Sequence, residues 1–118
     1  MQELLEQAQP PDAVFVANYL MTIGALHAIA EARLAVPNDV AVVGFDDVPW
    51  STLLRPPLTA VAQPAYDLGM ESARLLLSRL DGYVGAARMV TLSPSLRIRG
   101  SSVPKRQVPA RRGLANTP

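Results

Sequence analysis

The sequence contains no cysteine and a single histidine, His27. The lack of cysteine excludes disulfides and thiolate chemistry, and one histidine excludes a metal site built from several histidines. Aromatic residues make up only 5% of the chain, which favours an aliphatic α/β core over a β-sandwich. Neither the Gly-x-Ser-x-Gly motif of hydrolases nor a glycine-rich phosphate loop occurs. We therefore expect no enzyme activity, no metal and no cofactor.

Long apolar runs are also missing. No stretch reaches the roughly 18 apolar residues that a membrane-spanning helix needs. Residues 1–6 carry acids and lack the basic region of a secretory signal peptide. We expect no membrane contact, and 118 residues allow one domain at most.

The net charge of +1 hides an uneven distribution along the chain. Residues 1–81 contain all ten acids and four bases, a charge of −6, whereas residues 82–118 contain seven bases and no acid. The folded part is therefore predicted to be acidic. Residues 101–118 are rich in proline and basic residues and lack an apolar period, so we predict a disordered tail. Its charges would give only weak, salt-sensitive attraction to nucleic acid.

Two apolar runs predict the buried strands of a parallel sheet. The run Val40–Gly44 is apolar or glycine at every position. A strand with one solvent-exposed face would instead alternate between apolar and polar residues. Continuous apolar runs are typical of strands that helices cover on both faces. Residues 13–17 have the same composition, so we predict a second strand of this kind.

A helix between these strands completes a strand–helix–strand unit. Asn18 is a good N-cap for a helix over about residues 19–33. The apolar stripe of this helix is Leu20, Ile23, Ala30 and Leu34. Such units cross over in the right-handed sense almost without exception, so the two strands are predicted to be parallel neighbours.

The other elements are predicted from the same patterns: helical turns at 2–8 and 48–54, strands at 58–62, 88–93 and 95–99, and a helix at 65–80. The inward face of this last helix is predicted to be Leu68, Leu75, Leu76 and Leu80. Asp81-Gly82 ends it. Residues 1–100 are thus predicted to form an α/β fold, with an open, mainly parallel sheet flanked by helices.

Polar side chains follow both buried strands. Asp46 and Asp47 follow the central strand, and Asn18 follows the first. Ligands of open parallel sheets bind outside the carboxyl ends of the strands, so Asn18 and Asp46 are placed to bind a polar ligand. Each also has a structural interpretation, because Asn18 could be only an N-cap and Asp46 only a solvated acid or a cap.

Asp47 is expected to differ from Asp46. Consecutive residues of an extended chain point to opposite sides, which disfavours a catalytic dyad or a shared metal site. We interpret Asp47 as a cap for the turn near Pro49. His27 is interpreted as a surface or interface residue, and Trp50 as an anchor of packing or of a subunit interface.

Several segments, in order, resemble the C-terminal part of LacI/GalR-type transcriptional regulators. These segments are Pro11–Asn18, Ile23–Leu26, Val36–Val40, Val43–Asp47, Pro56–Pro64 and Leu96–Gly100. The resemblance covers about residues 10–102 without an obvious gap. Periplasmic sugar-binding proteins share the fold, but the segment Pro56–Pro64 points to the regulators.

The resemblance implies the C-terminal lobe of a two-lobed, periplasmic-binding-protein-like effector domain. It also implies a cytoplasmic homodimer that binds a sugar or nucleoside-like effector and reaches operator DNA only through a helix-turn-helix headpiece, which this sequence lacks. By position, Asn18 and Asp46 match residues that bind effector hydroxyls, and Gln63 matches a further pocket residue. Tyr19 departs from the family, in which an aspartate usually follows the asparagine. The dimer face maps onto Ile23, His27, Leu53 and Leu54.

Three alternatives remain open. The chain could be the sugar receptor of an ABC importer, or a small hydrolase that uses Asp46 and His27. It could also be an inactive fragment, whose cut sheet would then aggregate or pair with another chain.

Overall fold

The computed structural model describes residues 1–103. Its elements are α1 (Gln2–Leu5), β1 (Ala13–Val16), α2 (Tyr19–Glu31), β2 (Ala41–Phe45), the 3-10 helix η1 (Pro49–Thr52), β3 (Thr59–Ala62), α3 (Ala65–Leu80), β4 (Ser95–Arg97) and the 3-10 helix η2 (Gly100–Ser102). The predicted long helices, the turns near residue 50 and the strand before residue 63 are confirmed. None of the helices in these residues is long and apolar enough to cross a membrane.

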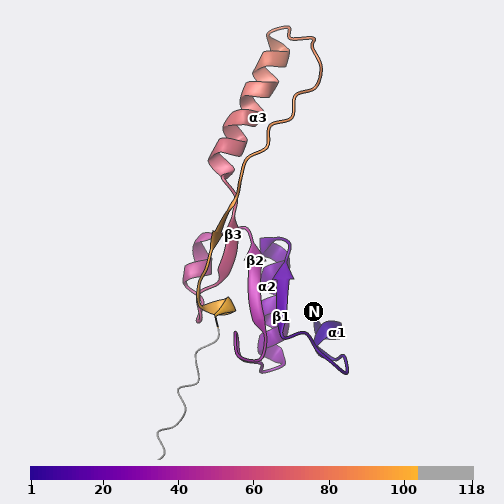
Figure 1. Ribbon diagram of the computed structural model, residues 1–118, viewed down its shortest axis with the longest axis vertical. Helices are drawn as coiled ribbons and strands as arrows, with labels where there is room; N and C mark the ends of the chain where they lie inside the picture. Colours follow the sequence, from indigo (N-terminus) through magenta and orange to yellow (C-terminus); the bar gives the residue numbers. More distant parts are fainter. Residues whose placement is uncertain (104–118) are drawn as a thin grey trace, which may run out of the picture.

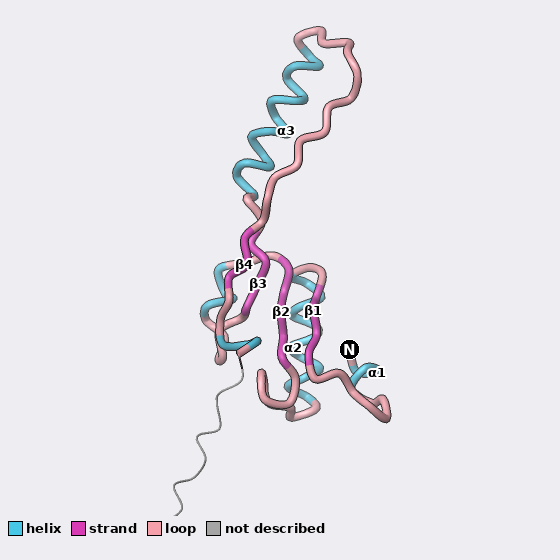
Figure 2. The backbone as a smooth tube through the Cα atoms, viewed as in Figure 1, coloured by secondary structure: helices cyan, strands magenta, loops and turns pink. Residues whose placement is uncertain are grey.

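The four strands form one sheet in the order β1-β2-β3-β4 (Figure 2). The first three strands are parallel, and β4 runs antiparallel to β3. Val16 is paired with Gly44 and Phe45 with Val61, so β1, β2 and β3 end together. This arrangement confirms the predicted open, mainly parallel α/β sheet.

The core lies between the sheet and α2. Val42 of β2 and Ile29 of α2 are buried there together with Val16, Val40 and Leu58. Gly44 permits this close packing, because a Cβ at this position would lie 3.2 Å from side-chain atoms of both Leu58 and Thr22.

The opposite face of the sheet is only partly covered, which corrects the prediction that helices cover both faces. Burial alternates along β2, with Val42 and Gly44 buried and their neighbours half-buried. Phe15 of β1 is 61% exposed on the open face and packs edge-on against Phe45, with ring centroids 6.4 Å apart. The continuous apolar run therefore marks a sheet whose second face is left largely uncovered by residues 1–103.

The buried side of α2 differs from the predicted stripe. Its buried residues are Thr22, Ala25, Ala28 and Ile29, whereas Leu20 and Ile23 of the predicted stripe are exposed. Leu34, beyond the helix, packs partly against the core. Small residues on the buried side bring α2 close to the sheet.

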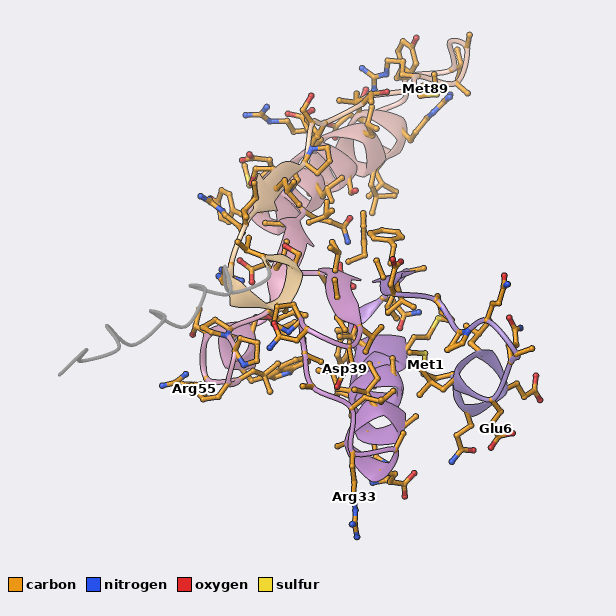
Figure 3. All side chains as sticks on the ribbon, turned by 60° about the horizontal axis from the view of Figure 1, so that its bottom comes forward. Met1, Glu6, Arg33, Asp39, Arg55 and Met89 are labelled. Atoms are coloured by element: carbon orange, nitrogen blue, oxygen red, sulfur yellow. The ribbon has the colours of Figure 1, made fainter. Side chains whose placement is uncertain are left out.

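α3 and the segment that returns from it, residues 65–94, form an arm that extends away from the sheet (Figure 1). The prediction that α3 packs inward is wrong, because the helix contains no buried residue. Leu76 and Leu80 are 61% and 73% exposed. Met89 lies at the far end of the arm (Figure 3). The predicted strand at residues 88–93 is also absent from the arm.

The C-terminal boundary of the fold lies later than predicted. Residues 100–102 form η2, and Ser101 is buried, whereas we predicted a disordered tail from residue 101. Ser101 Oγ donates to the carbonyl of Val42 at 2.6 Å, which ties this segment to the central strand. The rest of the predicted tail lies outside the described residues.

Candidate functional site

The three residues predicted to bind an effector lie at one end of the sheet. Asn18 follows β1, Asp46 follows β2 and Gln63 follows β3. Because the three strands are parallel neighbours, these residues share what we term the carboxyl end of the sheet. Strands lie about 4.8 Å apart, so Asp46 stands between Asn18 and Gln63. The base of the α3 arm lies at the same end (Figure 1).

Asp46 and Gln63 are in direct contact. Gln63 Nε2 donates to Asp46 Oδ1 at 2.5 Å, and the carboxylate has a second oxygen that can accept a hydrogen bond. Asp46 is half-buried and Gln63 is exposed. A carboxylate accepts stronger hydrogen bonds than a neutral oxygen does, so this pair can hold the hydroxyl groups of a ligand.

Asn18 is the N-cap of α2, which confirms its structural interpretation. Its Oδ1 accepts from the backbone N–H of Met21 at 2.8 Å. An asparagine amide has an acceptor oxygen and two N–H donors. The cap engages the oxygen, so the amide nitrogen retains its capacity to donate to a ligand. The two interpretations of Asn18 are therefore compatible.

Asp47 forms an ion pair, which corrects its interpretation as a cap. Its two carboxylate oxygens accept from Nη1 and Nη2 of Arg99, each at 2.7 Å. The N-cap of η1 is instead Val48, without a side-chain hydrogen bond. The hydrogen bonds from Arg99 hold the pKa of the Asp47 carboxyl below its ordinary value, although burial acts in the opposite direction. Asp47 is thus an ionised structural group.

Arg99 was not predicted as the partner of Asp47. Arg99, Thr59 and Ser101 form a hydrogen-bonded cluster with Asp47 and the strands, in which Thr59 N–H donates to Ser101 Oγ at 2.7 Å. More than 40 residues separate these partners in the chain. Nothing in the sequence near Arg99 distinguishes it from Arg97, two residues earlier, as the partner of Asp47.

The residues predicted at a dimer interface lie in two places. Ile23 and His27 are exposed on α2, and His27 Nδ1 lies 3.5 Å from Glu31 Oε2. Leu53 is exposed after η1, whereas Leu54 packs partly against the core. An interface through these residues stays a prediction, supported by exposure for three of the four.

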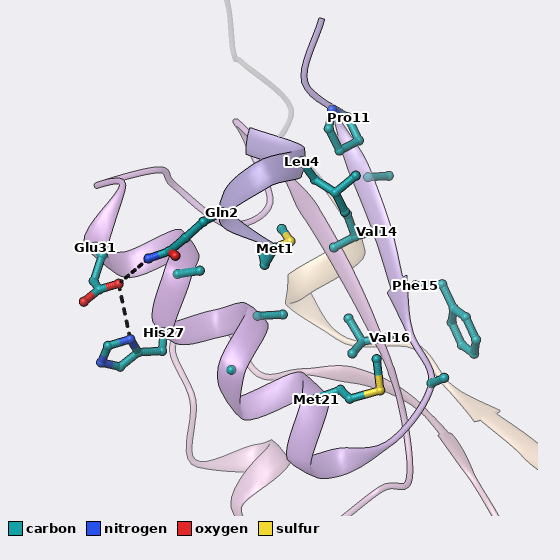
Figure 4. Close-up of a pocket in the computed structure, with 15 residues that line it drawn as sticks. Met1, Gln2, Leu4, Pro11, Val14, Phe15, Val16, Met21, His27 and Glu31 are labelled. Atoms are coloured by element: carbon teal, nitrogen blue, oxygen red, sulfur yellow. Dashed lines mark hydrogen bonds and ion pairs between the residues drawn. The ribbon is translucent and has the colours of Figure 1, made fainter. Parts of the chain in front are cut away.

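A separate apolar hollow of about 810 Å³ lies along β1 (Figure 4). α1 supplies Met1 and Leu4, and α2 supplies small residues and Met21. His27 and Gln2 both approach Glu31 at its rim. Ala13 to Ala17 of the β1 segment all line this hollow. The hollow therefore runs along the outer edge of β1. None of Asn18, Asp46 or Gln63 is among the described residues that line it.

A metal site is not evident in this part of the chain. Residues 1–103 contain no group of three His, Asp or Glu side chains that could hold an ion. The chemistry that the carboxyl end offers is hydrogen bonding from one carboxylate and two amides.

Comparison with known proteins agrees with this geometry. The family described as "Periplasmic binding protein-like domain" matches residues 1–102. The chain is 41% identical over 103 residues to the HTH-type transcriptional repressor CytR of Escherichia coli (strain K12). The aligned region covers 86% of the chain and 30% of the repressor. The chain therefore spans about a third of the length of this relative.

Solved structures give the same result. A putative LacI transcriptional regulator from Bacillus cereus subsp. cytotoxis NVH 391-98 is 29% identical, with a TM-score of 0.80 over 86% of the chain and 36% of the regulator. The transcriptional regulator CelR in complex with cellobiose is 40% identical, with a TM-score of 0.78 over 86% of the chain and 31% of CelR. The chain belongs to the periplasmic binding protein-like domain family, in the form found in LacI-type transcriptional regulators.

Proposed function

We propose that this chain is the effector-binding and dimerisation part of a LacI-type transcriptional regulator. Asn18, Asp46 and Gln63 would bind the hydroxyl groups of a sugar or nucleoside-like effector. The observation that carries the proposal is the Asp46–Gln63 hydrogen bond at the carboxyl end of the sheet, where open parallel sheets bind their ligands. The solved CelR relative, which is bound to cellobiose, supports a sugar as the effector.

The regulator is favoured over the receptor of a sugar importer. The relatives described above are a transcriptional repressor and two transcriptional regulators. Such proteins act where DNA is present, so we propose a cytoplasmic location. A hydrolase is disfavoured, because His27 lies on α2 beside Glu31, and Asp46 hydrogen-bonds to Gln63. We therefore propose a binding protein rather than an enzyme.

Dimerisation and DNA binding belong to the complete regulator in this proposal. Ile23, His27 and Leu53 would contribute to a homodimer interface, with Leu54 supporting it from the core side. Operator DNA would be bound through a helix-turn-helix headpiece of the complete regulator.

The test is a chimera in which residues 11–102 replace the matching stretch of CelR. Thermal shift with a panel of sugars and nucleosides identifies a ligand, and calorimetry then measures its affinity. Loss of a hydrogen bond to a charged group costs about 1.5–3 kcal/mol, so Asp46→Ala should weaken binding at least about tenfold. Asp12→Ala removes an exposed acid at the other end of β1 and serves as the control.

Unchanged affinity in the Asp46→Ala chimera would refute the assigned role of the carboxylate. Equal weakening by Asp12→Ala would show that net charge, and not a contact, is responsible.

A further inference from the structure

Asp46 has an unusual backbone conformation for a residue with a side chain. Its φ is 78°, in the left-handed region that is unfavourable for residues with a Cβ. Its backbone N–H donates to the carbonyl of Val61 at 3.0 Å, which fixes the start of the turn on β3. The direction of the Asp46 side chain then depends on the peptide that joins it to Asp47.

Asp47 is held firmly by Arg99. The two hydrogen bonds between them join both ends of the guanidinium to both carboxylate oxygens. The side chains of Asp47 and Arg99 are only 16% and 20% exposed. A bidentate pair fixes orientation as well as distance, so Asp47 cannot turn without breaking two charge-assisted bonds.

Arg99 is itself attached to the strands. Its Nη1 also donates to the carbonyl of Leu58 at 2.7 Å. Its backbone N–H donates to Thr59 Oγ1 at 2.8 Å, and Thr59 is buried. Ser101, two residues further, is bonded to both Thr59 and Val42. The network therefore runs without a break from the buried strands to Asp47.

We propose that Asp47 and Arg99 are positioning residues for the Asp46 carboxylate. The pair holds the turn after β2 so that Asp46 faces Gln63 at the carboxyl end. This inference rests on the proposed function, in which Asp46 binds the effector. It adds two residues that touch no ligand but determine how well the ligand is held.

The two consecutive acids are bonded to different ends of β3. Gln63 follows β3 at the base of the arm, whereas Arg99 lies beyond β4, beside the amino end of β3. Gln63 contacts Asp46 and Arg99 contacts Asp47. The turn after β2 is therefore attached at two separate points, and the Arg99 contact holds Asp47 independently of Gln63.

The side-chain amide of Gln63 reports the orientation of Asp46 without any ligand. In NMR spectra of the full 118-residue chain, the amide proton that donates to Asp46 should lie downfield, and Gln63→Glu assigns the signal. Asp47→Asn and the milder Arg99→Lys should move this proton to the position of a solvated glutamine amide. Lysine keeps the positive charge but cannot form the bidentate hydrogen bonds that a guanidinium forms with a carboxylate.

Ser101→Ala is the matched control, since it removes two hydrogen bonds of the same cluster without touching Asp46 or Asp47. The Gln63 signal should stay at its wild-type position in this variant. The proposal is overturned if the signal is unchanged in Asp47→Asn and Arg99→Lys, or if Ser101→Ala moves it equally. It is also overturned if both pair variants unfold while Ser101→Ala stays folded, because the pair would then hold the sheet rather than the turn.

Affinity in the CelR chimera separates this inference from the proposed function. Arg99→Lys should weaken ligand binding about tenfold. If Asp46→Ala abolishes binding and Arg99→Lys does not weaken it, the positioning role is wrong and the proposed function stands. If the Gln63 signal responds as expected but Asp46→Ala leaves affinity unchanged, the proposed function fails and the positioning role stands.

Discussion

At the scale of single residues, Asn18 shows how one side chain can serve the fold and a ligand together. Its oxygen accepts from the N–H of Met21 and satisfies one of the unpaired donors at the start of α2. The nitrogen of the same amide has no part in this cap. The cap also fixes the rotamer of Asn18, so a ligand that accepts from the nitrogen would meet a donor already in place.

Substitutions at Asn18 should separate these two roles. Asn18→Ala removes the cap and should lower the free energy of unfolding by about 1 kcal/mol. Asn18→Asp keeps an oxygen for Met21 and adds a negative charge at a helix N-terminus, which is favourable, so stability should be retained. It removes the N–H donors, so effector affinity in the chimera should fall. Urea unfolding and calorimetry measure the two effects, and a stable Asn18→Asp with full affinity would assign Asn18 to the cap alone.

The Asp47–Arg99 pair should make stability depend on pH in acid. The folded-state pKa of Asp47 lies below its ordinary value of 3.8, so the folded state favours the ionised form. The contribution of the pair is complete above about pH 4 to 5 and is lost as the pH falls through the lower, folded-state pKa. Urea unfolding of the wild type and Asp47→Asn at several pH values should show a gap at pH 7 that shrinks in acid. A gap that stays constant from pH 7 to pH 3 would contradict this assignment.

At the scale of elements, periodicity predicted where the helices lie but not which sides they bury. α2 is apolar on most sides, so Leu20 and Ile23 were as plausible on the core side as Ala25 and Ile29. Tertiary packing decided which side is buried: Thr22 and Leu58 already fill the space beside Gly44, and Ala25, Ala28 and Ile29 complete the side that faces the sheet. Asn18, by contrast, was predicted as the N-cap from its residue type and position alone.

The arm shows what a strong local pattern cannot tell. α3 is clearly amphipathic in sequence, yet none of its residues is buried. Residues 88–93 have the composition of a strand, but a strand requires a hydrogen-bonding neighbour, and this segment lies in the arm, away from the sheet (Figure 1). Whether an element is buried depends on its partner, and the pattern within the element contains no information on that partner.

Stability should therefore be insensitive to the apolar side of α3. Leu76→Gln should change the free energy of unfolding of the sheet by less than about 0.5 kcal/mol, as is usual for exposed positions. Ile29→Val, which removes one buried methylene from the core, should cost about 1 kcal/mol. Urea unfolding followed by the fluorescence of Trp50, which packs partly against the core, measures both. A cost for Leu76→Gln that equals that of Ile29→Val would show that α3 packs on the sheet in solution.

At the scale of the whole molecule, the positions of the candidate residues were easier to predict than the packing around them. The rule that parallel strands end together places Asn18 and Asp46 at one end of the sheet from the order of the elements, whereas Gln63 was identified through the family resemblance. The cluster of Arg99, Thr59 and Ser101 could not be predicted in this way. It depends on the return of the chain from the arm to an antiparallel strand, and thus on contacts between distant segments.

The same architecture leaves several apolar surfaces uncovered in residues 1–103. The outer side of β1 borders an apolar hollow, Phe15 lies open on the sheet, and the arm exposes a row of leucines. Exposed strand edges and large apolar patches promote association, so the isolated chain should self-associate as its concentration rises. A charge on an exposed strand opposes such pairing, so Phe15→Lys should lower the average mass in light scattering. Leu20→Lys, which charges an equally exposed position on α2, should do so less, and a wild-type chain that stays monomeric would contradict this account.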